Sequence, residues 1–343
     1  MPVPAPLIVL VAASLLAGIT GTLDVGVAEP AAVAALVVLL FNGGVDIGWS
    51  RMRPSLGPVL SAGIAGTCLT TGVIALAAHA IVGLDWTTAG LVGAALASTD
   101  PAMVFSVLRG QRLKGRTGTI LEGEAGFNDP ASIALMLGMI ELATHDDASF
   151  LVVVSTFVVQ MGLGAIFGTL AAPAFRRLHR PSLLLLAAGA LYGGTALCGG
   201  SGFLAVFVVG LLIADDLAGL HSAIANAGEL LGFGALGLTV ALTQLPATTW
   251  RDGAILVAAM ALVARPLTVA TTLPTLPRND RLFAAWCGLK GANPLLLGTF
   301  AVLEPVPHAG RIYDLVFVGV VLSVLAQGTF VPALAKRLDL LVP

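Results

Sequence analysis

Long apolar stretches, separated by short polar or charged segments, run along the whole chain. A helix needs about 20 mostly apolar residues to cross the hydrocarbon core of a bilayer, and by that measure we predict about twelve spanning helices. Their expected ranges are 5–21, 30–49, 55–83, 86–108, 117–143, 149–175, 181–198, 201–214, 219–244, 251–273, 280–302 and 311–335. The pattern therefore predicts an all-α polytopic membrane protein, with residues 1–343 forming a single membrane domain.

Two of these helices are expected to be discontinuous, because polar residues and a proline interrupt them near the middle. Ser98–Pro101 interrupts the range 86–108, and Lys290–Pro294 interrupts the range 280–302. A broken helix in a bilayer frees N–H and C=O groups, so it is tolerated only where protein or a water-filled cavity satisfies them. We therefore expect the two broken helices to cross at a site.

The positions of the two breaks also suggest an internal repeat. The ranges 55–83, 86–108 and 117–143 would form one unit. The second unit would comprise 251–273, 280–302 and 311–335. An odd number of helix steps separates the units, so they would enter the membrane in opposite senses. Inverted repeats with broken helices are typical of secondary transporters.

Loop charges predict the orientation of the helices. Basic residues gather in alternate loops and at the C-terminus: Arg51, Arg53, Arg109, Arg112, Lys114, Arg116, Arg176, Arg177, Arg180, Arg278, Arg281, Lys336 and Arg337. The opposite loops hold mainly Asp24, Glu29, Asp85, Asp146, Asp147 and Glu304, with Arg251 and Arg311 against the trend. The positive-inside rule then places the basic loops and both termini in the cytoplasm. Asp46 and Glu122 are expected near the cytoplasmic rim, as solvated helix ends.

Composition excludes several classes of function. Of 343 residues, 57% are hydrophobic and 10% are charged, whereas soluble domains carry roughly a quarter charged residues. A net charge of −2 argues against a nucleic-acid partner. Cys68, Cys198 and Cys287 lie in apolar stretches without metal-ligand spacing, so we interpret them as core residues. The absence of a phosphate loop, nucleophile elbow or HExxH pattern argues against an enzyme and an organic cofactor.

Asp129 is the best candidate for a working group inside the membrane. It lies about twelve residues into the range 117–143, which is close to mid-bilayer at about 1.5 Å per residue. Ionisable groups at such depth are functional by default. A buried carboxyl can hold either a proton or a hard monovalent cation, so competition for Asp129 would couple two fluxes. The alternative is a structural carboxylate that is paired with Lys290 or Arg265.

The two breaks supply the next candidates. Interrupting a helix leaves two half-helix ends of opposite partial charge. We expect Asp100 to neutralise the positive end, with direct ion binding as the alternative, and Thr99 to offer an oxygen to an ion. In the second break, Lys290 can neutralise a negative end, and Asn293 would pair with the backbone that Pro294 frees.

Two further acidic residues lie within predicted helices. A buried carboxylate without a counter-charge is very costly, so Glu124 is expected to pair with Lys290 or Arg265 from another helix. Glu229 could pair with Arg265 in the same way or serve a structural role. Spacing alone does not choose among these pairings.

Several short motifs together resemble the monovalent cation/proton antiporter superfamily, in its sodium/proton exchanger branch. The likeness is greatest to the bacterial potassium/proton antiporters associated with cell-volume regulation. The matching segments follow the family order across nearly the whole chain: Leu40–Gly44, Ala97–Ala102, Leu121–Glu124, Asn128–Pro130, Ala264–Leu267, Trp286–Pro294 and Gln327–Pro332. Each alone is a weak signal, whereas the set in this order is specific.

The resemblance implies a division of the chain and a way of moving. The core, with the crossed helices, would comprise approximately residues 55–143 and 251–335. Residues 1–54 and 149–244 would partly form a scaffold and dimerisation domain. The core would move like an elevator, and the protein would be a homodimer in contact with membrane lipid.

The resemblance also implies the ion site. It assigns Na⁺ or K⁺ binding to Asp129 with Thr99, and structural roles to Asp100, Asn128 and Glu124. The full expected set comprises Asp129, Thr99, Asp100 and Asn128 at the site, with Glu124, Lys290, Arg265 and Asn293 as supporting groups. In this family an Asn-Asp pair accompanies electroneutral one-for-one exchange.

Three features depart from the family pattern. Ala125 stands where members often have serine, so one hydroxyl ligand is missing. Lys290 stands where members usually have arginine, which keeps the charge but loses the planar fork. The chain also starts at what resembles the second helix of many relatives.

The sequence therefore favours an electroneutral Na⁺ or K⁺/H⁺ antiporter of the inner membrane, with no cofactor beyond the transported ions. One alternative is a sodium-coupled organic-solute symporter of similar architecture, which would need a roomier, polar-lined cavity. Another is a non-transporting sensor built on the same fold. The retained Asp100, Asn128, Asp129 and Arg265 argue against the sensor.

Overall fold

The computed structural model describes residues 4–108, 111, 113–145, 147–178, 180–214 and 222–342, and for 222–226 only the backbone. Arg109, Arg112 and Asp146 of the loop-charge pattern lie outside this part. Within it the fold is helical, with a single isolated bridge between Leu113 and Leu341. The helices are α1 Ala5–Thr20, α2 Val25–Ile47, α3 Trp49–Met52, α4 Leu56–Leu60, α5 Gly66–Ala77, α6 Trp86–Ala95, α7 Pro101–Val107, α8 Thr117–Thr144, α9 Phe150–Phe175, α10 Pro181–Leu197, α11 Gly202–Ile213, α12 Ser222–Gly237, α13 Ala247–Ala259, α14 Arg265–Thr272, α15 Arg278–Trp286, α16 Ala292–Leu303, α17 Ala309–Ser323 and α18 Val331–Arg337.

The predicted helix ranges match most of these elements closely, with clear differences at the start of α2 and the end of α12. That helix begins at Val25 rather than at residue 30, because the Asp24 carboxylate caps it and accepts from the Gly26 N–H at 2.8 Å. Pro30 is accommodated inside the helix. The predicted range 219–244 is too long, since α12 ends at Gly237.

Several long helical segments contain a π-helical turn, which inserts one extra residue into the helix. Ser61–Ala65 joins α4 to α5, and Met260–Ala264 joins α13 to α14. Val324–Gly328 follows α17 in the same way. The turns leave the segments continuous, so Trp49–Val82, Ala247–Thr272 and Ala309–Arg337 are each long and apolar enough to cross a bilayer. Together with α2 and α9, five helices of the described part meet that standard, and the count of about twelve crossings stays a prediction.

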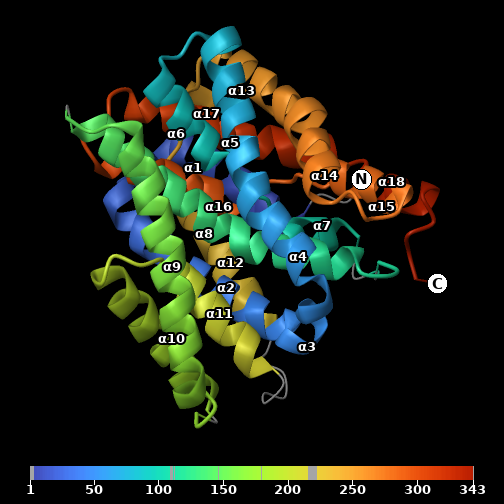
Figure 1. The fold of residues 1–343 in the computed structure, drawn as a ribbon. Coiled ribbons are helices and arrows are strands. Elements are labelled where there is room, and N and C mark those ends of the chain that lie inside the picture. The colour runs from blue at the N-terminus through green and yellow to red at the C-terminus, as the bar shows by residue number, and fades with distance from the viewer. Residues whose placement is uncertain are drawn as a thin grey trace.

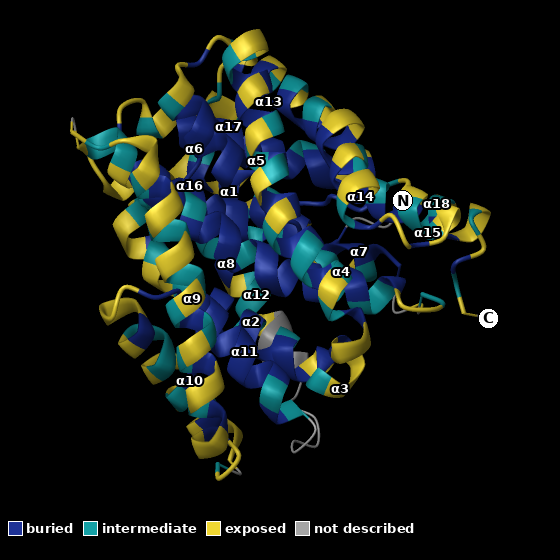
Figure 2. Ribbon diagram, in the orientation of Figure 1, coloured by how far each residue is buried: buried dark blue, intermediate teal, exposed yellow. Residues whose placement is uncertain are grey.

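Helix α2 lies in the interior of the molecule and packs against α8, α11, α12 and α16. Close backbone approach makes this possible: a Cβ on Gly44 would collide with the backbone of α11, and a Cβ on Gly210 would collide with Phe41 of α2. Small residues allow membrane helices to pack this tightly. Helices α9 and α10 lie at the periphery (Figure 1) and carry much of the exposed apolar surface, whereas α8 and α11 are mostly buried (Figure 2).

Both expected helix breaks are present, and they lie side by side. Residues 96–100 separate α6 from α7, and residues 287–291 separate α15 from α16. The Asp100 N–H donates to the Leu289 carbonyl at 2.9 Å, so each break satisfies part of the backbone that the other frees. The two discontinuous helices are therefore held together at their interruptions.

Candidate functional site

Asp100 caps the second half of the first broken helix. Its Oδ1 accepts from the backbone N–H of Ala102 at 2.8 Å and of Met103 at 3.4 Å, at the start of α7. Pro101 needs no such partner because it has no N–H. This is the position in which a carboxylate neutralises the positive end of a helix, as the sequence predicted for Asp100.

Two buried basic side chains face the negative ends of the broken helices. Lys290 Nζ donates to the carbonyls of Ser98 at 2.6 Å and Ala97 at 3.5 Å, just after α6. Arg265 Nη2 donates to the carbonyls of Ala284 at 3.0 Å and Cys287 at 3.5 Å, at the end of α15. The expectation that Lys290 neutralises the negative end within its own break is therefore wrong, because Lys290 acts on the opposite break and Arg265 occupies the negative end of the second one.

The buried partner of Glu124 is Arg265. Both guanidinium nitrogens contact the carboxylate, Nη1 to Oε1 and Nη2 to Oε2, the latter at 3.4 Å. Both side chains are only 2–3% exposed. Lys290, the other partner considered from the sequence, is occupied by the carbonyls of the first break. The pair links α8 to α14 and satisfies two charges that could not be buried alone.

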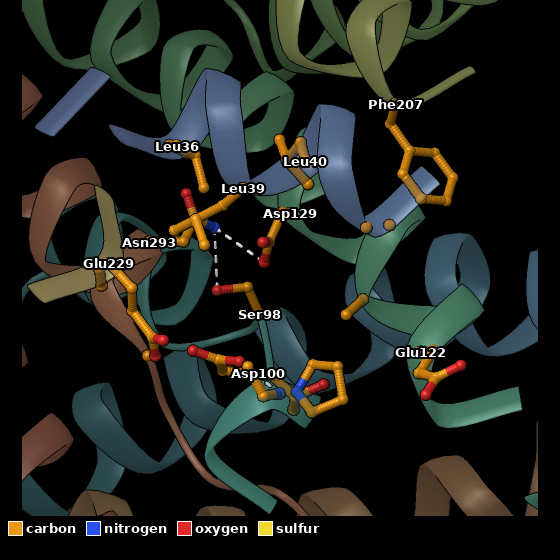
Figure 3. Close-up of a pocket in the computed structure, with 18 of the residues that line it drawn as sticks. Leu36, Leu39, Leu40, Ser98, Asp100, Glu122, Asp129, Phe207, Glu229 and Asn293 are labelled. Atoms are coloured by element: carbon orange, nitrogen blue, oxygen red, sulfur yellow. Dashed lines mark hydrogen bonds between the residues drawn. The ribbon is translucent and has the colours of Figure 1, made fainter. Parts of the chain in front are cut away.

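Asp129 is one of three side chains that accept hydrogen bonds from the Asn293 amide. The Asn293 Nδ2 group donates to Asp129 Oδ1 at 3.1 Å and to Ser98 Oγ at 3.0 Å (Figure 3). It also donates to Ser132 Oγ at 3.2 Å. An amide carries two such hydrogens, so three acceptors share them. Neither Lys290 nor Arg265 forms an ion pair with Asp129. The pairing required by a purely structural role for Asp129 is thus not found.

Asn128 ties α8 to the first break. Its Nδ2 donates to Thr99 Oγ1 at 2.7 Å, and both residues are buried. The Asn128 Oδ1 is buried without a hydrogen-bond partner among the described residues. The sequence suggested that Asn293 pairs with the backbone near Pro294, but its amide bonds side chains around Asp129 instead. The Asn293 Oδ1 is also buried without a hydrogen-bond partner among the described residues.

A cavity of about 240 Å³ opens beside these groups and gathers acidic side chains from several helices, here called the Asp129 cavity. Its acidic lining residues are Asp46, Asp100, Glu122, Asp129 and Glu229. The opposite wall is apolar and includes Leu36, Leu39, Leu40 and Phe207 (Figure 3). Thr99, Ala125 and Asn293 also line it. The cavity leaves room for a hydrated ion beside the carboxyl of Asp129.

The far end of the Asp129 cavity is a polar rim. Arg51 Nη2 lies 3.6 Å from Glu122 Oε2, and its Nη1 donates to the Asp46 carbonyl at 3.0 Å. The Arg51 and Glu122 side chains are 59% and 30% exposed. Asp46 and Glu122 thus lie at partly solvated helix ends, as expected.

Three groups near Asp129 escaped the sequence-based prediction of the site. The hydroxyls of Ser98 and Ser132 share the Asn293 amide. Glu229 of α12 lines the cavity, with its carboxyl directed toward Asp100 (Figure 3), and does not pair with Arg265. The sequence had identified Glu229, but as a partner of Arg265 or a structural residue rather than as part of the site, whereas the two serines gave no comparable signal.

Comparisons with known proteins agree with this geometry. The family model described as "sodium/hydrogen exchanger, transmembrane" matches residues 2–337, and the chain belongs to this family. It is 33% identical over 334 residues to the K⁺/H⁺ antiporter NhaP of Alkalimonas amylolytica, and 31% identical over 331 residues to the K⁺/H⁺ antiporter NhaP2 of Shewanella sp. strain ANA-3. Each alignment covers 90% of this chain and 57% of the relative, so the chain spans a little over half of their length.

The fold has a close counterpart among solved structures. The sodium proton antiporter MjNhaP1 from Methanocaldococcus jannaschii superposes with a TM-score of 0.83, covering 97% of this chain and 92% of the other at 21% sequence identity. The expected family and the expected all-helical fold are therefore confirmed, and the chain is a multi-pass membrane protein.

Proposed function

We propose that this protein exchanges Na⁺ or K⁺ for H⁺ across the membrane, with Asp129 as the group that the two ions share. The observation that carries the proposal is the Asp129 carboxyl, which lines a cavity, accepts only neutral hydrogen bonds and lies beside two helix breaks. Among the described residues, the buried bases Lys290 and Arg265 bind backbone carbonyls and Glu124 rather than pairing with Asp129. The names of the relatives, potassium/proton and sodium/proton antiporters, support the same reaction.

The surroundings of Asp129 suit competition between a proton and an alkali cation. Carboxylate, hydroxyl and amide oxygens are the ligands that such hard cations prefer, and Asp129, Thr99 and Asn128 provide them within or beside the cavity. Asp100 holds the backbone of the first break in place, and the Asn293 amide holds the Asp129 carboxyl. Because H⁺ and the cation carry the same charge, replacing one by the other at a single carboxylate makes the exchange electroneutral.

The packing suggests which parts move. We assign α4–α8 and α13–α18 to a core that carries the two breaks, and α1, α2 and α9–α12 to a scaffold through which the protein forms a homodimer. The Asp129 cavity lies between the two groups, since its lining comes from α2, α11 and α12 on one side and α7, α8 and α16 on the other. In an elevator mechanism the core, built from two inverted repeats, would carry Asp129 past the scaffold.

The cavity wall favours an ion over an organic solute. Leu36, Leu39, Leu40 and Phe207 face Asp129 and offer no hydrogen-bond donor or acceptor to a polar substrate. A sodium-coupled symporter would need such groups. We further infer from the positive-inside rule that both termini face the cytoplasm, and from the family resemblance that the protein resides in the inner membrane.

Exchange in proteoliposomes tests the proposal directly. Asp129→Asn preserves shape and hydrogen bonding but removes the charge, so we expect cation-dependent proton movement to fall to the level of empty vesicles for both Na⁺ and K⁺. Glu141→Gln provides the matched control, because Glu141 lies near the other end of the same helix, exposed and bonded only to Thr156. Exchange retained by Asp129→Asn would refute the assignment.

A further inference from the structure

A second cavity, of about 400 Å³, lies at the opposite ends of the same helices and is here called the Glu29 cavity. Glu29 belongs to the first turns of α2, whereas Asp46, in the Asp129 cavity, belongs to its last turn. Glu304 directly follows α16, and Ser201 lies between α10 and α11. The two cavities therefore occupy the two ends of the bundle.

Four helices, α2, α8, α11 and α16, line both cavities and connect them. Helix α8 contributes Glu122 and Asp129, seven residues apart, to the first cavity, and Ile133 and Leu137, which follow at intervals of four residues, to the second. Helices α2 and α16 do the same, and α2, α8 and α16 pack against one another in the middle of the molecule (Figure 1). A continuous line of side chains thus leads from Asp129 to the second cavity.

Only a thin apolar layer separates the Glu29 cavity from Asp129. Ile133 lies one helical turn beyond Asp129, a rise of about 6 Å. On α2, Leu36 lies between Glu29 and Asp46, and on α16, Leu296 lies between Asn293 and Phe300; Leu36, Ile133 and Leu296 are at most 5% exposed. Charged or hydrated ions cross such a layer only when it opens, because desolvation is very costly.

The charge of the Glu29 cavity is not compensated. Within the described residues, neither Glu29 nor Glu304 forms an ion pair. The two arginines expected on this face, Arg251 and Arg311, both bind Asp252, at 2.8 and 3.3 Å. A concave surface with negative charge raises the local concentration of cations and their association rate.

From these observations we propose that the Glu29 cavity is the external vestibule of the transport path, in which Glu29 and Glu304 concentrate monovalent cations. Leu36, Ile133 and Leu296 form the barrier that closes this vestibule from Asp129 while the Asp129 cavity opens to the cytoplasm. This inference rests on the proposed exchange function. Glu29 and Glu304, two carboxylates outside the ion site, would then control cation access from one side of the membrane only.

Cysteine accessibility tests the sidedness without requiring transport. In a variant that lacks Cys68, Cys198 and Cys287, Leu137→Cys reports on the Glu29 cavity and Phe105→Cys on the Asp129 cavity. A membrane-impermeant cationic methanethiosulfonate reagent is added to either side of oriented vesicles. Its reaction is read as protection from later fluorescent labelling.

We expect the reagent to modify Leu137→Cys at least tenfold faster from outside and Phe105→Cys at least tenfold faster from the cytoplasmic side. Val158→Cys, on an exposed apolar face of α9, is the control that should resist both. Modification of Leu137→Cys from the cytoplasmic side, equally from both sides, or not at all would overturn the proposal, whether or not Asp129 proves to be the exchange site.

Transport kinetics test the role of the two carboxylates. The double variant Glu29→Gln with Glu304→Gln should raise the KM for the external cation about threefold or more at low ionic strength, and leave the KM for the internal cation unchanged. Glu141→Gln removes a charge at the same end of α8 but outside the cavity, and should change neither value. Equal changes on both sides, or no change in the external KM, would contradict the proposal.

Discussion

Two carboxylates of one helix, Glu124 and Asp129, have opposite surroundings although only five positions separate them. Glu124 is 2% exposed and is bound by the guanidinium of Arg265, which also holds the end of α15. Asp129 faces a cavity and accepts a hydrogen bond from a neutral amide that two serine hydroxyls share. A rotation of about 140° along the helix produces this difference.

With Asp129 in its proposed role, one helix separates stability from exchange. A carboxylate with a fixed cationic partner cannot readily take up a second cation, so Glu124 contributes to holding the core together. A carboxylate that neutral donors position keeps its charge available for a transported ion. The predictions below test whether these two roles are separable, beginning with the largest expected effect.

Removal of the partner of Glu124 should damage the fold rather than the ion site. Arg265→Met leaves a buried carboxylate without its counter-charge and the last carbonyls of α15 without donors, at a cost of about 3–5 kcal/mol. We expect a strongly lowered melting temperature in detergent, measured by size-exclusion after heating. Lys114→Met is the control, because Lys114 and its partner Asp339 are 42% and 91% exposed and such surface pairs contribute little. An unchanged melting temperature for Arg265→Met would remove the structural role assigned to this pair.

Lys290 offers the same test at the first break, with a smaller effect. Lys290→Met removes the donor to the carbonyls of Ser98 and Ala97, and we expect a loss of about 1–3 kcal/mol in stability. Lys290→Arg, which restores the residue usual in the family, should recover most of it. Lys336→Met at the surface serves as the control in the same melting experiment. If Met and Arg behaved alike at position 290, the carbonyl contacts would be energetically unimportant.

On the other side of the comparison, Asn293→Ala should weaken cation binding while the fold persists. Asp129 then loses its amide donor and the fixed orientation that this donor gives. A hydrogen bond to a charged group contributes about 1.5–3 kcal/mol, so we expect a KM for the cation at least about tenfold higher. Dye-monitored exchange with Na⁺ and with K⁺ measures it. Asn279→Ala, whose amide bonds only the Leu338 carbonyl near the surface, should behave like the parent; a similar KM in both variants would exclude a positioning role.

The smallest effect concerns the missing hydroxyl at Ala125. This residue lines the Asp129 cavity, and Ala125→Ser places an oxygen where many relatives have one. We expect the KM for the preferred cation to fall about two- to threefold, which corresponds to less than about 1 kcal/mol. Ala171→Ser on α9, away from the cavity, is the control for a general effect of an added hydroxyl. A raised KM would mean that the cavity is already optimally filled by alanine.

The sequence predicted the helical segments and the two breaks well because apolar length and proline act locally. Prediction was weaker wherever a partner comes from a distant part of the chain. Glu124 and Arg265 lie 141 positions apart, so only the rotation and depth of two packed helices decide between Arg265 and Lys290. The same limit explains why Lys290 was not placed on the carbonyls of the other break.

Within the candidate site, most groups were found, and the two serines and the position of Glu229 were missed. Asp129, Asp100 and Thr99 stand out because a polar residue in an apolar stretch is costly. Ser98 and Ser132 do not stand out, since a serine can satisfy its hydroxyl on its own helix. Both cavities are likewise products of packing, because their walls combine residues of helices that are far apart along the chain.

The π-helical turn Met260–Ala264 sets the direction in which Arg265 leaves its helix. It ends immediately before Arg265, and each residue of an α-helix advances the side-chain direction by about 100°. Deleting one residue there would restore regular geometry and swing the guanidinium away from α8 without altering a single charged amino acid. The register of one backbone turn is therefore as necessary for the central ion pair as the chemistry of its two members.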